Sequence, residues 1–486
     1  MTYDIIIIGG GISGLYTLHK LTQKYIDANI ILLESRSFMG GRIKTEYMSN
    51  NTVQYETGPW RFHNSHKRLI KLLNHYKLKF KQNTSSKAIN KIISIPHCVH
   101  TSKTLKKNKP HSGLSYRDIK LQNQRCSSEI DMYDKLPLNM DSTSKPYDVG
   151  MSYTGKYYIM NNGFSHLIDL MTKDYNSNII TDCKVINIIR QDTFYNVYVQ
   201  IRNKNKYLYK TFVTKYIFCC LPPSALLNYT ISEHLLPIIH SIESIPLHHI
   251  YAKTKQDTSD LSFYYRTNSP LGHIISGDYN NWFQISYSAG ENARYWERLK
   301  LDNKIKFKKT LLSYYEKFEK KVGIYIKSIK DIKSYYWENA IHIWRPVYGF
   351  DINKNVINSV YPHPVELPNL FLAGEACSSI QGWIEGSLET SEIAIDIFDK
   401  IQQKSYTFQT VNLSNPDDFI TIDSRVLNIK KWKKRHPGST KAIENHVKDK
   451  DAKHVFDQIG HSSTAYATLF AIQNFWLLND QIGVFK

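Results

Sequence analysis

The first forty-two residues contain a group of glycines and one carboxylate whose spacing suits a dinucleotide. Gly9, Gly11 and Gly14 follow the pattern G-x-G-x-x-G, and Glu34 comes twenty residues after the last of them. Glycines so placed allow a tight turn, let the backbone approach a pyrophosphate, and let a helix pack closely on a strand. A carboxylate at the end of the next strand can hold ribose hydroxyls. These residues predict a dinucleotide site.

Two apolar runs must position these residues. Residues 5–8 are all isoleucine, as expected for a buried parallel strand, and the run 30–33 leads into Glu34. The stretch between them predicts a helix whose N-terminus, with its free N–H groups, would face the phosphates. A glycine turn between a strand and a helix can also be purely structural. Here, however, every element that the motif requires occurs in order.

A second strand–turn–helix block lies near residue 380. Residues 370–373 form an apolar run, Gly374 and Glu375 follow, and Gly382 and Gly386 precede a predicted helix that continues to about Phe398. The start of that helix would direct N–H groups at an anion-forming ring. No second G-x-G-x-x-G occurs, so the sequence offers no obvious nicotinamide domain.

Taken in order, these motifs resemble the flavin-containing amine oxidase family over about residues 1–400. The resemblance rests on the first glycine motif with Glu34, on Gly40-Gly41-Arg42, on Glu56-x-Gly58, and on the block from Ala373 to Gly386. It implies the α/β class, with a Rossmann-like FAD-binding domain interleaved with an α+β substrate domain. It also implies an oxidoreductase that transfers hydride from an amine or amino acid to flavin, with oxygen or a redox protein as electron acceptor.

The resemblance also implies which residues contact FAD. The cofactor-binding residues that it indicates are Gly9, Gly11, Ser13, Gly14, Glu34, Gly41, Arg42, Gly58, Val185, Gly374, Glu375 and Ile384. Glu34 would bind the adenosine ribose, Val185 the adenine, Glu375 the ribitol or pyrophosphate, and Ile384 the pyrimidine edge. Some members attach FAD through a cysteine upstream of the Ala-Gly-Glu segment. No cysteine lies between Cys220 and Cys377, so we predict noncovalent FAD.

Two residues are predicted to act in catalysis. Family members often carry a lysine that reaches the flavin through water. The matching position here is Tyr251, and Lys253 lies two residues further on the same strand face. Lys253 can equally be a surface lysine. Trp383 falls where one aromatic residue of the substrate cage would stand. Arg61 and Arg345 would favour an amino-acid substrate if they bind a carboxylate, although either can be structural.

The last eighty residues contain two histidines, each beside a glycine turn. His436 and His461 lie twenty-five residues apart. Two neutral imidazoles can occupy both axial positions of haem iron, which favours electron transfer. Apolar residues that could wall a flat cofactor lie nearby: Ile429, Trp432, Phe456 and Ile459.

The order and spacing of this segment resemble the cytochrome b5 haem-binding domain. The resemblance implies a small α+β domain that binds haem b with His436 and His461 as axial ligands. Ser439 replaces the second glycine of the His-Pro-Gly-Gly turn. A domain that kept the fold and lost the haem is the alternative.

The predicted organisation has two main parts. Residues 1–403 form the oxidase-like part, and residues 404–486 form the haem-binding domain. Within the first part we expect the FAD-binding segments at about 1–60, 160–225 and 350–400, and the substrate segments at about 61–160 and 226–349. The spacing of Leu69, Leu72, Leu73 and Tyr76 predicts helix over 61–95, and residues 96–146 read as a polar, irregular insertion.

Composition limits the remaining choices. The formal charge is +20, but the basic residues are spread along the chain and no nucleic-acid module is visible, so we expect no specific nucleic-acid partner. No apolar run is long enough for a transmembrane segment, and no signal peptide is visible. The six cysteines form no C-x-x-C pair, which favours a reducing, cytoplasmic location, or a virion if the source is a large DNA virus.

Two other functions remain open at this stage. The same glycine motifs occur in flavin desaturases, which act on a carbon–carbon bond. A flavoprotein with a purely structural role is the second alternative. Reduction of the flavin by amines or amino acids would separate both from an amine oxidase.

Overall fold

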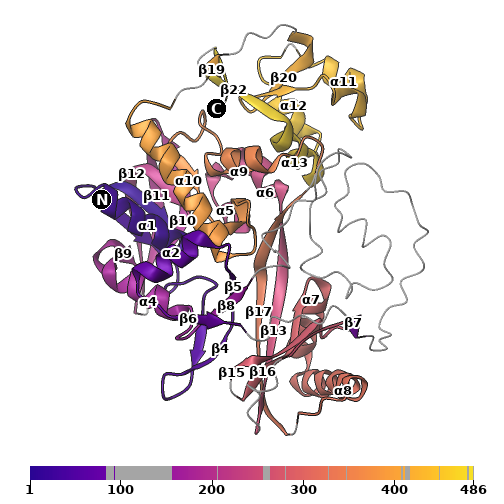
Figure 1. Ribbon diagram of the computed structural model, residues 1–486. Coiled ribbons are helices and arrows are strands. Elements are labelled where there is room, and N and C mark those ends of the chain that lie inside the picture. Colours follow the sequence, from indigo (N-terminus) through magenta and orange to yellow (C-terminus); the bar gives the residue numbers. More distant parts are fainter. Residues whose placement is uncertain are drawn as a thin grey trace.

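The computed structural model describes most of the chain outside the predicted polar insertion. The described residues are 1–83, 92–93, 156–204, 206–255, 263–279, 281–326, 328–345, 347–406, 409–410, 416–447, 449–478 and 481–484. The prediction of an irregular insertion at 96–146 therefore falls outside them. The described chain contains five sheets, and the three largest, with seven, six and five strands, organise it (Figure 1).

The first strand, which leads into the first glycine turn, lies inside a seven-stranded sheet. β1 (Thr2–Ile8) runs parallel to β2 (Ile30–Leu33) on one side and to β12 (Lys206–Cys219) on the other. The other strands are β9 (Ile179–Ile180), β10 (Cys183–Gln191), β11 (Phe194–Asn203) and β18 (Leu370–Leu372). Strands from both ends of the oxidase-like part thus share one sheet.

Both faces of this sheet are covered. Ile5 and Ile7 pack toward α1 (Ile12–Lys24), α2 (Lys67–His75), α4 (Ser165–Asp174) and α10 (Ile384–Gln402). Ile6 and Ile8 pack on the other side, toward the residues of α5 (Pro223–Leu226), η3 (Thr230–His234), α6 (Leu236–Ser241) and α9 (Ile352–Val360). This alternation explains why all four isoleucines of β1 are buried.

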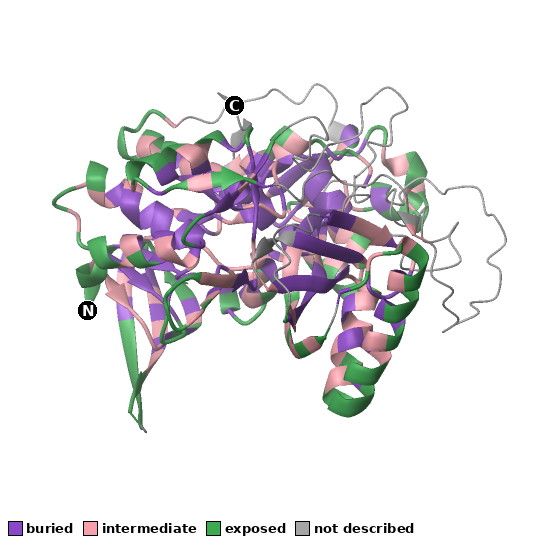
Figure 2. Cartoon of the chain, turned by 60° about the horizontal axis from the view of Figure 1, so that its bottom comes forward, coloured by how far each residue is buried: buried purple, intermediate pink, exposed green. Residues whose placement is uncertain are grey.

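A second, six-stranded sheet extends away from the first. Its order is β17-β13-β16-β15-β14-β7, and its two long strands are β13 (Ile242–Thr254) and β17 (Ile329–Trp344). The others are β7 (Ile92–Ile93), β14 (Phe263–Thr267), β15 (His273–Tyr279) and β16 (Trp282–Ala289). The helices α7 (Glu291–Asp302) and α8 (Lys304–Val322) cover one face, and α8 turns an exposed side to solvent (Figure 2).

The C-terminal region forms a five-stranded sheet with short helices. The sheet order is β19-β23-β22-β21-β20. Its strands are β19 (Gln409–Thr410), β20 (Phe419–Ile422), β21 (Arg425–Asn428), β22 (Gln473–Leu478) and β23 (Gln481–Val484). Its helices include η5 (Pro416–Asp418), η6 (Lys433–Arg435), α11 (Thr440–Glu444), α12 (Lys453–Gln458) and α13 (Ser463–Ile472). None of the helices in the described part of the chain combines the length and apolar character of a membrane span.

One predicted element is wrong over most of its described length. Among the described residues of this range, 61–83 and 92–93, helix occurs only at α2, and strands β5 (Phe62–His63) and β6 (Phe80–Gln82) flank that helix. Both strands pair with β8 (Tyr157–Met160), a partner too distant for local periodicity to reveal. The predicted helix after Phe164, the strands across 179–220 and the strand at 370 are confirmed. The domain boundaries themselves stay predictions.

Candidate functional site

The first glycine turn is packed too tightly for any side chain at its third glycine. A Cβ added to Gly14 would lie 2.0 Å from the carbonyl oxygen of Gly9, which has a φ of +106°. The helix α1 therefore begins directly above the end of β1. The hydroxyl of Ser13 lies 3.0 Å from that of Ser391 and so faces α10. Gly11, by contrast, borders open space, because a Cβ added there would meet no heavy atom within 4 Å.

A second glycine turn lies against the first. The Gly40 N–H donates to the Gly10 carbonyl at 2.8 Å, and a Cβ on Gly41 would come 3.3 Å from the Gly11 Cα. A Cβ on Gly58 would lie 1.9 Å from the Arg42 carbonyl oxygen, so the Glu56-x-Gly58 segment closes the same region. The two turns leave a backbone surface beside Gly11 that suits a close phosphate approach.

Glu34 lies at the rim of this surface. It is buried, and its carboxylate accepts the Gly10 N–H at 2.7 Å and the Arg36 N–H at 2.8 Å. Its carbonyl oxygen accepts the Cys183 N–H at 2.8 Å, which places the start of β10, and with it Val185, beside the end of β2. The predicted ribose and adenine residues are therefore neighbours.

Both halves of the predicted flavin site meet at Glu375. Its carboxylate accepts from the Arg42 guanidinium and from the Gly382 N–H, both at 2.8 Å. The same carboxylate lies 2.5 Å from Nδ1 of His342, on β17. Burial alone would raise the pKa of Glu375, but His342 and Arg42 lower it to about 2. Nε2 of His342 is buried and has no hydrogen-bond partner within the described residues.

The helix α10 begins beside this cluster. Ile384 is its first residue and Trp383 its N-cap, whose side chain makes no capping hydrogen bond. A Cβ on Gly386 would lie 2.2 Å from the Ser378 hydroxyl, so the turn before the helix is tightly folded. Gly374 again borders open space. Glycines bordering open space, helix-terminal N–H groups and an unpartnered His342 nitrogen together suit an anionic cofactor such as FAD.

An aromatic cluster adjoins Trp383. The Trp383 ring lies 4.9 Å from that of His66 and 6.2 Å from that of Tyr157. The Arg61 guanidinium lies over Tyr157 at 4.4 Å and over Trp60 at 4.7 Å. Arg345 lies elsewhere: its backbone N–H and its Nε donate to the Ser241 and His240 carbonyl oxygens. Of the two arginines singled out from the sequence, Arg61 alone joins the aromatic cluster.

The predicted lysine lies beside an aromatic ring. The ammonium of Lys253 is 5.8 Å from the Trp282 ring. Tyr251 is the β13 residue that reaches the Glu56–Gly58 segment, because its hydroxyl donates to the Glu56 carbonyl at 2.5 Å. A catalytic role for Lys253 stays a prediction.

The two histidines of the C-terminal domain are arranged as a pair. Their ring centroids lie 6.4 Å apart. Two imidazoles that share one metal through bonds of about 2.0–2.1 Å have centroids roughly 6 Å apart. Nδ1 of His436 lies 3.2 Å from the Ser439 carbonyl oxygen, and Nδ1 of His461 lies 2.8 Å from that of Phe456. A carbonyl can only accept, so both Nδ1 atoms carry the proton and both Nε2 lone pairs are available for iron.

Glu56, in the Glu56-x-Gly58 motif, supplies a test of the packing. Burial raises its pKa to about 8, although Phe164 N–H and the Thr45 hydroxyl donate to it. The folded chain therefore keeps a proton that the unfolded chain loses above its ordinary pKa, and stability falls as pH rises from about 4.5 to about 8. We expect Glu56→Gln to remove this slope, roughly 1.4 kcal/mol per pH unit.

Thermal unfolding at pH 5 and pH 8 measures the effect. Wild type should lose more stability between these pH values than Glu56→Gln. Glu46→Gln, on the neighbouring strand β3 (Thr45–Tyr47), removes a more exposed carboxylate that pairs with Lys44 at 2.8 Å, and it should keep the wild-type slope. Equal slopes in wild type and Glu56→Gln would contradict the assignment.

Comparisons with known proteins agree with the two-part architecture. Residues 7–76 match the NAD(P)-binding Rossmann-like domain, and residues 405–477 match the cytochrome b5-like heme/steroid binding domain. Two solved structures of redesigned putrescine oxidase variants cover 82% of this chain and 99% of theirs, with TM-scores of 0.55 and 0.58 and identities of 13% and 12%. At such identity the likeness shows the fold. The chain has the α/β fold of an amine oxidase, followed by a cytochrome b5-like domain.

Two curated relatives match shorter stretches. An uncharacterized protein of Acanthamoeba polyphaga mimivirus is 38% identical over 58 residues, and an L-amino-acid oxidase of Neurospora crassa is 42% identical over 65 residues. The matched stretches span 11% and 9% of those relatives.

Sequence reasoning missed three residues of the site. His342 lies in a long strand whose pattern gave no sign of a partner at Glu375. His66 and Tyr157 reach Trp383 only because β5 and β8 pair across the insertion. His342 is a polar residue at a buried position of a predicted strand. Such a residue requires a polar partner, and this requirement is the signal that sequence reasoning could have used.

Proposed function

We propose that the chain is an FAD-dependent oxidoreductase that oxidises the C–N bond of an amine or amino acid. We propose further that its haem-binding domain receives the electrons. The Arg42–Glu375 pair supports the first proposal, because it joins the two glycine-rich segments of the predicted FAD site at one point. When bound, the flavin accepts hydride from the carbon beside the amine nitrogen. The substrate loses two electrons and haem iron takes one at a time, so two successive transfers would be needed.

The chain's own residues would bind the cofactor and orient the substrate. The turns at Gly9–Gly14 and Gly40–Gly41 suit the phosphates, Glu34 the ribose, and the start of α10 the flavin ring. We propose that FAD is held noncovalently. Cys377, which precedes this helix in the sequence, is buried, and burial raises the pKa of its thiol to about 12, so it is a poor nucleophile. Release of all flavin on denaturation without proteolysis tests this.

The visible spectrum tests the function directly. We expect the purified protein to show flavin and haem bands. Under anaerobic conditions, a panel of amino acids, monoamines and polyamines should contain a substrate that bleaches the flavin first and then reduces the haem. A flavin that no member of the panel reduces would contradict amine oxidation. Haem that stays oxidised beside fully reduced flavin would contradict the electron transfer alone.

Arg61 indicates an amino acid as the substrate. Arg61 is 8% exposed, and its guanidinium lies among the rings of Trp60, Tyr157 and Tyr264, beside the cluster that contains Trp383. A buried guanidinium binds a carboxylate through two parallel hydrogen bonds. We expect Arg61→Met to raise KM for the best amino acid at least tenfold.

The matched control is a substrate rather than a second variant. The amine that lacks only the carboxylate should react equally with wild type and Arg61→Met. An equal loss for both compounds would mean that Arg61 supports the fold of the cluster. Lys253→Met belongs in the same assays, because slower flavin reduction at unchanged KM supports a catalytic role for Lys253.

The location that we propose is a reducing compartment such as the cytoplasm, or a virion. All four cysteines in the described residues are unpaired, and the mimivirus relative agrees with a viral source.

A further inference from the structure

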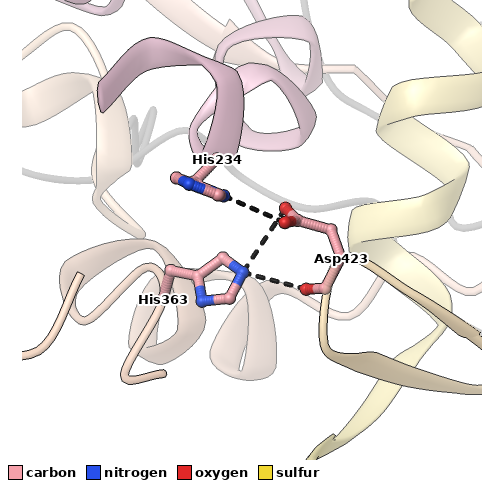
Figure 3. A group of neighbouring side chains, drawn as sticks. All are labelled: His234, His363 and Asp423. Atoms are coloured by element: carbon pink, nitrogen blue, oxygen red, sulfur yellow. Dashed lines mark hydrogen bonds and ion pairs between the residues drawn. The ribbon is translucent and has the colours of Figure 1, made fainter. Parts of the chain in front are cut away.

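A buried polar network connects the oxidase-like part to the haem-binding domain (Figure 3). His234 ends η3, and His363 lies between α9 and β18, both in the oxidase-like part. Asp423 lies in the turn between β20 and β21 of the haem-binding domain, and Arg425 begins β21. Asp423, Arg425 and His363 are 7%, 0% and 0% exposed.

Each member of this network bonds across the boundary. The Asp423 carboxylate accepts from His234 Nδ1 at 2.9 Å, and its backbone carbonyl accepts from His363 Nε2, also at 2.9 Å. Arg425 donates to the Asp423 carboxylate through Nη1, and to the His234 carbonyl at 2.6 Å through Nη2. The Asp451 carboxylate holds the turn in shape, because it accepts the N–H groups of Asp423 and Ser424 at 2.8 and 2.9 Å.

The two histidines and Asp423 carry the ligand types of a metal site, and their ligand atoms lie within 4.8 Å of one another. Their hydrogen bonds argue against that use. Nδ1 of His363 accepts the Glu366 N–H at 3.1 Å, so Nε2 carries the proton and donates to Asp423. The buried Arg425 guanidinium already supplies the positive charge that the carboxylate requires. The network is therefore an ion pair within the haem-binding domain, Asp423–Arg425, that is joined by hydrogen bonds to His234 and His363 of the oxidase-like part.

Apolar packing accompanies the network. The helix α13 lies on α6, and the buried Phe470 ring is stacked on Trp344 at 6.4 Å. The ring centroids of Tyr466 and His240 lie 5.0 Å apart. A Cβ on Gly349 would lie 2.7 Å from a methyl of Ile472, so the loop after β17 is pressed against the end of α13. Several packing contacts and one polar network thus share the interface.

We propose that His234, His363, Asp423 and Arg425 are positioning residues that fasten the haem-binding domain to the oxidase-like part in one orientation. Apolar contacts give an interface area, whereas buried charged hydrogen bonds are satisfied in one geometry only. The haem and the flavin are then held at a fixed separation during electron transfer. The inference that these residues fix the orientation of the domain is supported by the contacts alone. The role of this fixed orientation in electron transfer rests on the proposed function.

Cleavage of the folded chain tests the fastening. A protease recognition sequence inserted between Tyr406 and Gln409 leaves β19 with the haem-binding domain, where it pairs with β23. After cleavage of the loaded protein, the wild-type fragments should elute together on gel filtration. We expect Asp423→Asn to weaken their association at least tenfold, so that the fragments separate at micromolar concentration.

The control removes a similar pair inside the haem-binding domain. Asp449 and His446 lie 2.7 Å apart and make no cross-boundary bond in the described structure, so Asp449→Asn should behave as wild type. His234→Ala weakens the network from the other side and cannot unfold the haem-binding domain directly, so it should also separate the fragments. Separation of the wild-type fragments, co-elution of both variants, or separation of wild type by a chelator would each overturn the proposal.

Viscosity tests the role in electron transfer. Once a substrate is known, sucrose can be used to raise the viscosity of the solution. In the wild-type protein, the rate at which haem is reduced after the flavin should not change with viscosity. In Asp423→Asn the rate should fall as viscosity rises, because the domain must find its place by diffusion. A rate of haem reduction that depends on viscosity in the wild-type protein would overturn the fixed separation of haem and flavin. Haem that is never reduced, in a chain whose fragments stay together, would contradict the proposed electron transfer and leave the fastening intact.

Discussion

His461→Ala should abolish haem binding and leave the flavin in place. The ring pair of His436 and His461 matches the separation that two axial ligands need, and each Nδ1 is already held by a backbone carbonyl. Loss of one imidazole would remove one of the two bonds between the protein and the iron, and would open that side of the iron to water. We expect the haem absorbance of the purified variant to fall to less than a tenth of wild type, at unchanged flavin content.

Another histidine of the same domain provides the control. His454, on α12, is exposed, so His454→Ala should retain the full haem absorbance. His436→Ala should behave like His461→Ala. A full haem spectrum in either ligand variant would refute bis-histidine ligation. A wild-type protein that takes up no haem when haem is added would instead indicate a domain that kept its fold and lost its cofactor.

Glu375→Ala should have the second large effect, on flavin binding and on stability together. The substitution leaves the Arg42 guanidinium, His342 Nδ1 and the Gly382 N–H without their shared acceptor. Removal of one partner from a fully buried charged pair costs about 3–5 kcal/mol, and the low end of this range applies here because the Arg42 side chain is 35% exposed. If that cost falls on the binding-competent form, FAD affinity drops by roughly 100-fold or more. Flavin fluorescence released on dilution measures the affinity, and thermal unfolding without added FAD measures the stability.

A surface carboxylate on α10 separates this effect from a general loss of charge. Asp396 pairs with Lys400 at 2.7 Å and is 62% exposed. Exposed pairs contribute about 0–1 kcal/mol, so Asp396→Ala should keep both the flavin and the melting temperature. Glu375→Ala that retains flavin with wild-type affinity would show that the carboxylate acts only in packing.

The parts of the site that sequence predicts well are local. The contact of Gly14 with Gly9 follows from a strand, a turn and a helix that are contiguous, so the glycine spacing alone indicates it. The pairing of His436 with His461 is similarly carried by two short turns within one small domain. In both cases backbone geometry or ligand chemistry restricts which residue types can occupy the positions, and this restriction can be recognised in the amino-acid sequence.

The parts that sequence does not predict depend on distant pairing. The Arg61–Tyr157 contact requires β5 to pair with β8, across an insertion whose length hides the relation. His342 reads as one more residue of a long strand until β17 is seen to end beside Glu375. In the sequence, Asp423 and Arg425 resemble an ordinary polar turn. They are buried by residues from a distant part of the chain, and local periodicity does not reveal such a contact.

The Arg42–Glu375 pair also has a consequence for how the protein is made. Its two residues are 333 positions apart. At about 5–20 residues per second, a ribosome needs on the order of half a minute to synthesise the second after the first. During that interval the N-terminal glycine turns exist without the carboxylate that closes their site, and the seven-stranded sheet still lacks β18. We therefore expect cofactor capture to be a late event of biosynthesis, and in cells starved of riboflavin the complete chain should stay open and be more sensitive to proteases.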